Sequence, residues 1–448
     1  MNDTKTIFAL ASAAGKAGVS VFRISGAHAE FALRKLGIDD KLEPRKAYLR
    51  RLKKDNGSVI DEALVIYFEN PHSFTGEDIV ELHLHGSLAV VTDLTEYLSS
   101  FSEFRMAEAG EFSRRAFENG KLDLTRLEGL ADLIDSETKL QQKQALRQLS
   151  GELEKLYESF REELLAILVN IEAYIDFPDE EIPDHLDLAA QEQVQNLVTS
   201  LKDHVNDRRG EILRNGIHAV ILGAPNVGKS SLMNYLAKRD VAIVSNIAGT
   251  TRDIIEIHLD INGLPITLSD TAGIREASDE IESLGINIAL KKAEDADLKI
   301  IIFDAETYPD LDQQSLNLID DNSIILLNKS DLMDNNGSEI VIGEQEAISI
   351  SIFDKTGMDK LISALENAVA DKISPSSNPL FTRERHKQQI NESIENLERF
   401  ITNRTDKIDI ELCAEDLRLA SNALGKITGK IDVEEILGKI FSSFCIGK

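Results

Sequence analysis

The sequence lacks the features of a secreted or membrane-spanning protein. Its 448 residues include only two cysteines, Cys413 and Cys445, which fits a reducing compartment, and no CxxC pair supports a zinc site. No run of about 18 apolar residues marks a spanning helix. Residues 1–20 lack a basic segment leading into a long apolar core, the pattern of a secretory signal. We therefore expect a cytoplasmic protein.

The sequence also lacks an excess of positive charge. It has 49 Lys and Arg residues against 78 Asp and Glu residues, a formal net charge of −29. Proteins that bind nucleic acid normally use cations to contact phosphates. The acidic surface could lie away from any RNA, or a basic partner could supply much of the RNA contact. The charge could also serve only solubility or reflect the source proteome, and composition leaves these alternatives open.

A glycine-rich motif lies in mid-chain. The segment GAPNVGKS at 223–230 follows the apolar run 219–222 and precedes a helix-like segment, so it matches GxxxxGK[ST]. Its glycines allow backbone N–H groups to form an anion-binding nest at a helix N-terminus. Lys229 can then reach the β- and γ-phosphates, and Ser230 can bind Mg²⁺. A simple glycine-rich turn is the alternative, but the strand–loop–helix context favours a nucleoside triphosphate site.

Two later motifs indicate guanine. The segment DTAG at 270–273 follows a strand-like run at 264–268, and NKSD at 328–331 follows the apolar run 324–327. DxxG alone is weak evidence. The carboxylate of Asp331 can accept hydrogen bonds from guanine N1 and the 2-amino group, whereas adenine offers neither donor and would leave a buried carboxylate unpaired. The order of the motifs therefore predicts a GTPase.

The switch segments raise a catalytic problem. The segment IAGTTRD at 247–253 offers Thr250 and Thr251 as ligands near Mg²⁺ and the γ-phosphate. Ile274 follows Gly273, where Ras-like proteins carry the glutamine that orients the attacking water. Hydrolysis then needs another polar group and another positive charge near the phosphates. Nearby acidic candidates are Glu276, Asp279, Glu280 and Glu282.

The first 118 residues show alternating strands and helices, with strand-like segments at 19–24, 63–68 and 79–84. Glu81, His83 and His85 alternate along the last of these, so they share one strand face. A metal cluster is one interpretation. No further His or Cys ligand follows nearby, which favours a packed or ligand-lining face.

Helical periodicity begins near Lys121. Leu146, Leu149, Leu153, Leu156 and Phe160 recur at spacings of three and four, which predicts one apolar stripe on a single long helix. Prolines in the segment 176–183 should break the helix that precedes it. A proline- and serine-containing linker is expected at 374–379, and further helices are expected at 384–402, 411–424 and 433–441.

These segments predict an α/β + α architecture. Residues 212–372 hold the GTPase motifs in strand–loop–helix order, as in a parallel α/β unit. The simplest arrangement inserts this GTPase domain between two halves of one helical domain. The chain end is also informative: Phe441, Phe444 and Ile446 disfavour a solvated tail, so we expect a tucked C-terminus. Cys445 could be a nucleophile, although a small buried thiol is the commoner case.

The motifs together resemble the family of tRNA-modification GTPases called MnmE or TrmE. The resemblance rests on the phosphate loop, on IAGTTRD and DTAGIREASDEIE, and on the terminal segment IFSSFCIGK. It rests equally on FRISG at 22–26, SFTGED at 73–78, GEFS at 110–113 and KLDL at 121–124. The resemblance covers the whole chain. It implies a Ras-like parallel-sheet GTPase domain inserted in a helical domain, preceded by an α/β tetrahydrofolate-binding domain.

The implied domains are an N-terminal folate-binding and dimerisation domain (1–118), a helical domain in two parts (119–211 and 376–448), and the GTPase domain (212–375). The resemblance assigns a potassium ion to Asn226, Ser245, Ile247 and Thr250, where other GTPases use an arginine finger. It assigns Mg²⁺ to Ser230 and Thr251, and the positioning of the attacking water to Glu282. It places a tetrahydrofolate one-carbon donor at Arg23, Glu81, Lys121 and Lys448.

Lys229 and Asn226 join Glu282 as the expected catalytic residues. The residues expected to surround GTP are Asn226, Val227, Gly228, Lys229, Ser230, Ser231, Ser245, Asn246, Ile247, Ala248, Gly249, Thr250, Thr251, Asp270, Thr271, Ala272, Gly273, Asn328, Lys329, Asp331, Ser351, Ile352 and Phe353.

The chain departs from the family pattern at several positions. The last guanine-binding loop is usually Ser-Ala-Lys or Ser-Ala-Arg, whereas this chain offers only Ser351-Ile352-Phe353, so the register of that loop is open. Ser245 and Ala224 stand where other members often carry threonine and arginine, and a proline common before Gly110 is missing. None of these changes removes a catalytic group.

The resemblance implies a potassium-dependent GTPase that installs an aminomethyl or carboxymethylaminomethyl group at C5 of the wobble uridine of certain tRNAs. It implies an FAD-containing MnmG-type partner and a homodimer formed through the N-terminal domains, together a heterotetramer. One alternative is a ribosome-assembly GTPase of the Era or EngA kind, which should carry a basic KH-like module after the GTPase domain. Another is a regulatory scaffold that only reports nucleotide state.

Overall fold

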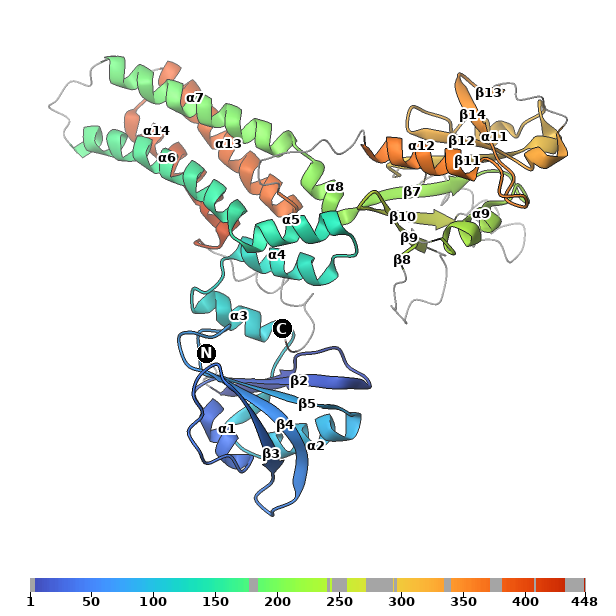
Figure 1. Cartoon of the computed structure of the whole chain (residues 1–448). Coiled ribbons are helices and arrows are strands. Elements are labelled where there is room, and N and C mark those ends of the chain that lie inside the picture. Colours follow the sequence, from blue (N-terminus) through green and yellow to red (C-terminus); the bar gives the residue numbers. More distant parts are fainter. Residues whose placement is uncertain are drawn as a thin grey trace, which may run out of the picture. The chain divides into compact units, whose positions relative to one another are not determined.

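The computed structural model describes most of the chain as two compact units (Figure 1). The described residues are 5–176, 184–239, 242–243, 256–270, 293, 296–333, 340–370, 381–406, 408–431 and 447. The first unit draws on residues 1–131, 148–195 and 392–448, and the second on 132–147 and 196–391. None of the helices in the described ranges is long and apolar enough to cross a membrane.

A six-stranded sheet organises the N-terminal part of the first unit. Its order is β3-β4-β5-β2-β1-β6, and β1 pairs in parallel with β6 while the other neighbours are antiparallel. The three strands expected from the sequence are confirmed as β2, β4 and β5. The strands are β1 (Thr6–Leu10), β2 (Ala17–Ser25), β3 (Ala47–Lys53), β4 (Val59–Phe68), β5 (Ile79–Gly86) and β6 (Phe104–Met106).

The two faces of this sheet differ. Helices α1 (Ala29–Lys35) and α2 (Leu88–Ser99) join one face, where Phe8, Phe22 and Leu82 are buried in one core. Side chains alternate along a strand, so Ile7 and Ala9 point to the opposite face, where they form a smaller cluster with Phe112 of α3 (Glu111–Glu118).

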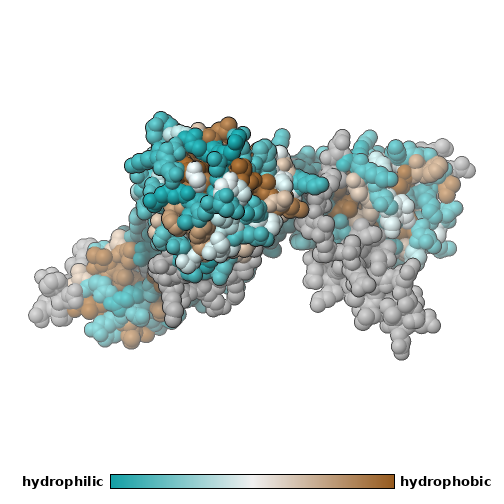
Figure 2. All heavy atoms as spheres, turned by 90° about the horizontal axis from the view of Figure 1, so that it is seen from below, coloured by the Kyte–Doolittle hydropathy of each residue, from teal (hydrophilic) through white to brown (hydrophobic). Residues whose placement is uncertain are grey.

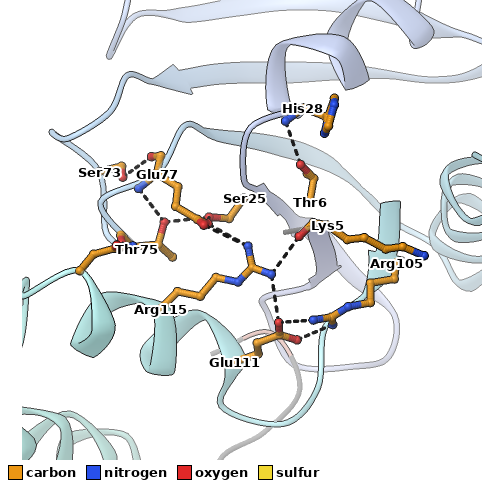
Figure 3. A network of polar contacts seen from close by, with 11 residues as sticks. Lys5, Thr6, Ser25, His28, Ser73, Thr75, Glu77, Arg105, Glu111 and Arg115 are labelled. Atoms are coloured by element: carbon orange, nitrogen blue, oxygen red, sulfur yellow. Dashed lines mark hydrogen bonds and ion pairs between the residues drawn. The ribbon is translucent and has the colours of Figure 1, made fainter. Parts of the chain in front are cut away.

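A polar network fixes the segment 73–78 to α3 (Figure 3). The guanidinium of Arg115 donates to both carboxylate oxygens of Glu77 at 3.1 Å, to Glu111 at 3.1 Å, and to the backbone carbonyl of Lys5 at 2.9 Å. Ser25 Oγ on β2 donates to Glu77 at 2.7 Å. One arginine therefore holds together a loop, a helix and the start of the first strand.

Glu111 is the second centre of this network. Arg105 donates to its two carboxylate oxygens, each at 2.7 Å, and the Glu108 N–H donates at 2.9 Å. Burial alone would raise the pKa of Glu111, but Arg105, the Glu108 N–H and Arg115 outweigh it and lower that pKa from its usual range. The carboxylate is therefore charged and fully engaged at neutral pH.

We predict that Arg115→Leu destabilises the chain by about 3 kcal/mol, because it removes a partner from the buried carboxylate of Glu111 and from the half-buried carboxylate of Glu77. Urea unfolding at neutral pH measures this change. Arg34→Ala is the control, since Arg34 is exposed, and it should change the free energy of unfolding by less than about 0.5 kcal/mol. Equal unfolding midpoints for the two variants would contradict the role given to Arg115.

One sequence expectation about the helices fails. The apolar stripe from Leu146 to Phe160 does not lie on a single helix: α5 (Lys139–Leu149) ends before α6 (Glu152–Asp176) begins. Gly151 between them has φ +86°, a conformation that favours glycine and that a continuing helix excludes. Leu146 is 47% exposed whereas Leu153 is 1% exposed, so the stripe is not one buried face.

The long helix α14 (Ile410–Thr428) packs along α6. Arg418 of α14 pairs with Glu172 of α6, and Lys430 just after α14 donates to Glu158 at 2.6 Å. Helices α4 (Leu124–Asp135), α7 (Asp184–Asn206), α8 (Arg209–Asn215) and α13 (Glu384–Thr405) are also present. The expected helix at 433–441, the linker at 374–379 and most of the proline break at 176–183 lie outside the described residues.

The second unit contains an eight-stranded sheet of order β13-β14-β12-β11-β7-β10-β9-β8. Strands β7, β10, β11, β12 and β14 run parallel. The strands are β7 (Ile217–Leu222), β8 (Ala242–Ile243), β9 (Glu256–Ile261), β10 (Leu264–Asp270), β11 (Leu298–Asp304), β12 (Ser323–Asn328), β13 (Ile340–Ile342) and β14 (Gln345–Ser349). Helices α9 (Lys229–Leu236), α11 (Gln313–Leu316) and α12 (Met358–Ala370) join them.

Both faces of the parallel strands are buried, as an α/β sheet requires. Along β11, Ile300 and Ile302 belong to one core and Ile301 and Phe303 to the other. The predicted strand–loop–helix unit is confirmed.

Figure 2 shows one face of the molecule, where the described residues are mostly hydrophilic and hydrophobic residues are scattered among them.

Candidate functional site

The GTPase motifs gather at the carboxyl ends of the parallel strands. The segment 223–230 follows β7, Asp270 ends β10, Asn328 ends β12 and Ser351 follows β14. Because parallel strands place these ends on one edge of the sheet, a ligand site forms there. Asp270 pairs through its backbone with Ile221, two residues before the phosphate loop begins.

The backbone of the phosphate loop requires glycine at two positions. Gly223 has φ +145°, and a Cβ there would lie 2.3 Å from the carbonyl oxygen of Ile302. Gly228 has φ +108°, and its Cβ would lie 2.3 Å from the side-chain nitrogen of Asn328. Asn226 also adopts a positive φ, +64°. This conformation gives the loop a tight turn directly before α9, as an anion-binding nest needs.

Lys229 is the buried cation of the loop. Its side chain turns back over the loop, where Nζ donates to the carbonyl oxygens of Gly223 and Ala224, both at 2.8 Å, and the residue is 8% exposed. Ser230 and Ser231 follow it in the first turn of α9 and are exposed. A buried ammonium beside the N-terminus of a helix attracts anions, so this geometry suits a polyphosphate.

Asn328 joins the phosphate loop to the guanine side of the site. Its Nδ2 donates to the Val227 carbonyl at 2.8 Å, and its Oδ1 accepts from the Ile352 N–H at 3.4 Å. Ser351 is buried while Phe353 is 89% exposed. The segment 351–353 therefore lies beside the NKSD motif, where a last guanine-binding loop is expected.

Two of the other three NKSD residues, Lys329 and Asp331, lie at the same edge of the sheet. Lys329 has φ +65°, and its ammonium pairs with Asp304 at the end of β11 and with Glu306 at 3.4 Å. The two carboxylates raise the pKa of Lys329, chiefly through the hydrogen bond to Asp304. Asp331 is exposed, so its carboxylate is open to a base.

Many predicted nucleotide contacts cannot be placed. Among the expected Mg²⁺ and potassium ligands, the described ones are Ser230 and Asn226, whose oxygen-bearing side chains suit hard cations and which lie at the phosphate loop. For Asp270 only the backbone is described. The predicted residues outside the described ranges are Ser245, Asn246, Ile247, Ala248, Gly249, Thr250, Thr251, Thr271, Ala272, Gly273, Glu282 and Lys448.

A second candidate site lies on the N-terminal sheet. Arg23 on β2 is in register with Glu81 on β5, and its Nη2 lies 2.8 Å from Glu81 Oε1. The guanidinium also lies over the rings of Phe74 at 5.4 Å and Phe112 at 5.6 Å. The structure thus brings two of the predicted folate residues together on the sheet face that α3 joins.

The remaining residues of this site are more dispersed. Lys121 donates to the Pro71 carbonyl at 2.6 Å. His83 Nε2 lies 3.8 Å from Glu81 Oε2, whereas His85 bonds Asp61 at 2.8 Å. No cluster of three or more His, Cys, Asp or Glu side chains in the described ranges could hold a metal ion.

Sequence reasoning missed several contacts at both sites. Phe74 and Phe112 lie within the quoted SFTGED and GEFS motifs, but nothing in those motifs shows that their rings flank Arg23. Asp304 follows the apolar run of β11 directly, a position that could have marked it as a residue of the site edge. Its pairing with Lys329 across neighbouring strands needed the three-dimensional register.

The fold and the site define the class of this protein. A parallel sheet that gathers a phosphate loop, a buried lysine and an NKxD motif at one edge is a Ras-like GTP-binding domain. The model of the MnmE helical domain matches residues 124–445, and the model of the GTP-binding protein TrmE N-terminus matches residues 6–121.

Full-length relatives agree with these matches. The tRNA modification GTPase MnmE of Paramagnetospirillum magneticum is 49% identical over 446 residues, which cover 99% of this chain and 100% of the relative. That of Wolbachia pipientis from Culex pipiens is 50% identical and covers 100% of both chains. The chain belongs to the MnmE family of tRNA modification GTPases, and it is a GTP hydrolase that acts in tRNA modification.

Solved structures of other GTP-binding proteins match part of this chain. Aquifex aeolicus Era Y63A bound to GDP.AlF4- is 25% identical, with a TM-score of 0.27, and the match covers 40% of this chain and 66% of that one. The FeoB G-domain from Methanococcus jannaschii is 26% identical, with a TM-score of 0.25, and the match covers 35% of this chain and 98% of that one.

We predict that Gly228→Ala abolishes GTP binding, because the added Cβ meets the Asn328 side chain and the positive φ is strained. Titration with a fluorescent GDP analogue should show an affinity loss of at least about 100-fold, or more than about 2.7 kcal/mol. Gly57→Ala is the matched control: Gly57 also has a positive φ, +82°, but open space around it. Equal affinity in both variants would contradict this account.

Proposed function

We propose that this chain is a potassium-dependent GTPase that works with an FAD-containing MnmG-type partner. Together they install an aminomethyl or carboxymethylaminomethyl group at C5 of the wobble uridine of certain tRNAs. A tetrahydrofolate derivative supplies the one-carbon unit. Membership of the MnmE family carries the tRNA part of this proposal, and the geometry of the two sites supports the GTP and folate parts.

The position of the chain end supports the folate part. Gly447, the penultimate residue, has φ +101°, and a Cβ on it would lie 2.1 Å from the Leu10 carbonyl oxygen and 2.9 Å from the Ala11 Cα. Leu10 ends β1, whose Ala9 is in register with Arg23. Gly447 therefore lies beside β1, the strand next to Arg23, and the proposal assigns its neighbour Lys448 to the same folate site.

The chemistry of the donor set suits a reduced folate. The carboxylate of Glu81 can accept hydrogen bonds from ring N–H and amino groups of a pterin, because an ionised carboxylate is an acceptor only. Arg23 orients that carboxylate through a charge-assisted contact. Lys121 and Lys448 add cations that complement the carboxylates of a folate tail.

At the nucleotide, each residue has a proposed role in hydrolysis. The backbone N–H groups of the phosphate loop and Lys229 hold the phosphates, and Ser230 and Thr251 bind Mg²⁺. A bound potassium ion would supply the positive charge that an arginine finger supplies in other GTPases. Asn226, Ser245, Ile247 and Thr250 provide its ligands.

Glu282 positions the attacking water in this proposal, which answers the question raised by Ile274. Asp331 and the loop from Ser351 to Phe353 read the guanine base, and the contact of Ile352 with Asn328 supports that register. The chain acts as a homodimer formed through its N-terminal domains, in a heterotetramer with the FAD protein. Its tRNA substrate places it in the cytoplasm.

We predict that GTP hydrolysis by the full chain is at least about tenfold faster in potassium than in sodium at equal ionic strength, since the ion replaces a missing positive charge. Asn226→Ala should abolish the stimulation and leave the slow sodium rate. Asn234→Ala, the same substitution at an exposed position of α9, should keep the potassium response. Equal slow rates in both salts for the unaltered chain would refute the potassium mechanism.

Folate binding separates the proposal from a ribosome-assembly GTPase. We predict that the full chain binds 5-formyltetrahydrofolate in isothermal titration, and that Glu81→Gln weakens binding at least about tenfold, a loss of about 1.4 kcal/mol, because a charged acceptor is lost. Glu62→Gln on neighbouring β4 is the control and should bind normally, since Glu62 is exposed. No binding by the unaltered chain would favour the assembly GTPase or a regulatory scaffold.

A further inference from the structure

One segment of this acidic chain carries a local excess of positive charge. Residues 34–54, here called the basic segment, contain nine of the 49 Lys and Arg residues and only three Asp or Glu residues. The chain as a whole carries a net charge of −29. The basic segment runs from the end of α1 through β3, which lies at the edge of the N-terminal sheet (Figure 1).

Because side chains alternate along β3, some of its cations point away from the core. Leu52 is fully buried in the core that α1 and α2 cover, and Arg51 and Lys53 flank it on the opposite face. Both cations are exposed, as is Leu49, at 59%. Tyr48 lies under the Arg50 guanidinium at 5.1 Å. Tyr48 and Arg50 share the core side of the strand with Leu52, so the opposite face of β3 presents the cations Arg51 and Lys53 beside Leu49.

Local carboxylates do not neutralise the segment. Five of its nine cations form ion pairs with Asp or Glu, the longest being Arg51 with Glu62 at 3.6 Å. Within the described part of the chain, the other four have no carboxylate partner: Arg34, Lys41, Arg45 and Lys53. Arg45 donates to the His72 carbonyl at 2.7 Å, which leaves its charge uncompensated.

We propose that the basic segment is a contact surface for the phosphate backbone of RNA. The inference rests on the proposed function, in which the chain acts on tRNA. An RNA-binding protein of net charge −29 must confine its phosphate contacts to a surface of locally positive charge, because repulsion opposes binding elsewhere. The paired cations contribute too, since surface ion pairs are weak enough for a phosphate to replace the carboxylate.

Protection of an edge strand is the competing explanation. Lysines on an edge strand discourage pairing with another chain, and that role needs no RNA. The two explanations predict different effects when the cations of the basic segment are replaced by neutral residues. Loss of edge protection would promote self-association. Loss of phosphate contacts would lower the affinity for RNA and make that affinity less dependent on salt.

The test measures the affinity of the full chain for a fluorescent tRNA transcript by anisotropy over a range of salt concentrations. The variant replaces Lys41, Arg51 and Lys53 by Gln. We expect the dissociation constant to rise about tenfold, and the slope of log affinity against log salt to become shallower by about two to three, since each of the three lost phosphate contacts removes about 0.7–0.9 from the slope. Potassium-stimulated GTP hydrolysis should be unchanged, because these residues lie outside the nucleotide site.

The matched control replaces three exposed lysines elsewhere, Lys143, Lys155 and Lys360, by Gln, which gives the same change in net charge. It should bind tRNA like the unaltered chain. Equal affinities and slopes for both triple variants would overturn the RNA surface and leave the proposed function standing. Self-association of the first variant in light scattering, with tRNA affinity unchanged, would assign the segment to edge protection. No tRNA binding by the unaltered chain would overturn both this inference and direct tRNA binding.

Discussion

The GTP site depends on one hydrogen bond, from the Asn328 amide to the Val227 carbonyl. Val227 belongs to the phosphate loop and Asn328 to the guanine-reading motif, so this contact sets the distance between the parts that hold the phosphates and the base. Asn328 is 4% exposed, which makes the bond strong and its loss costly. Gly228 is required because the same amide occupies the space of a Cβ.

The local motifs made much of this site predictable. A GxxxxGK[ST] sequence between an apolar strand and a helix imposes one backbone path, and the strands β7, β10 and β12 form where the apolar runs predicted them. The Ras-like domain therefore follows from the spacing of a few residues. The register of 351–353 was open in the sequence, because Ile352 and Phe353 do not resemble the usual loop. Only the contact between the Ile352 N–H and Asn328 supports an assignment.

Long-range pairings could not be predicted in this way. The rings of Phe74 and Phe112 flank Arg23 because a loop and a helix, 38 residues apart in sequence, are joined by the Arg115 network. The apolar stripe at 146–160 misled for a local reason: its periodicity continues across Ser150 and Gly151, whereas the positive φ of Gly151 ends the helix. Periodicity reports which residues are apolar, but it does not report where the backbone turns.

Lys229 shows how the phosphate loop is prepared for its ligand. A buried ammonium is costly unless it is hydrogen-bonded, and the carbonyls of Gly223 and Ala224 each accept a hydrogen bond from it at 2.8 Å. Carbonyls are neutral, so they stabilise the ammonium less than an anion does. A phosphate, being an anion, can form a charge-assisted bond with this ammonium, while the glycines already fix the backbone around it. Nucleotide affinity then arises from a loop whose backbone is formed in advance and whose buried ammonium complements an anion.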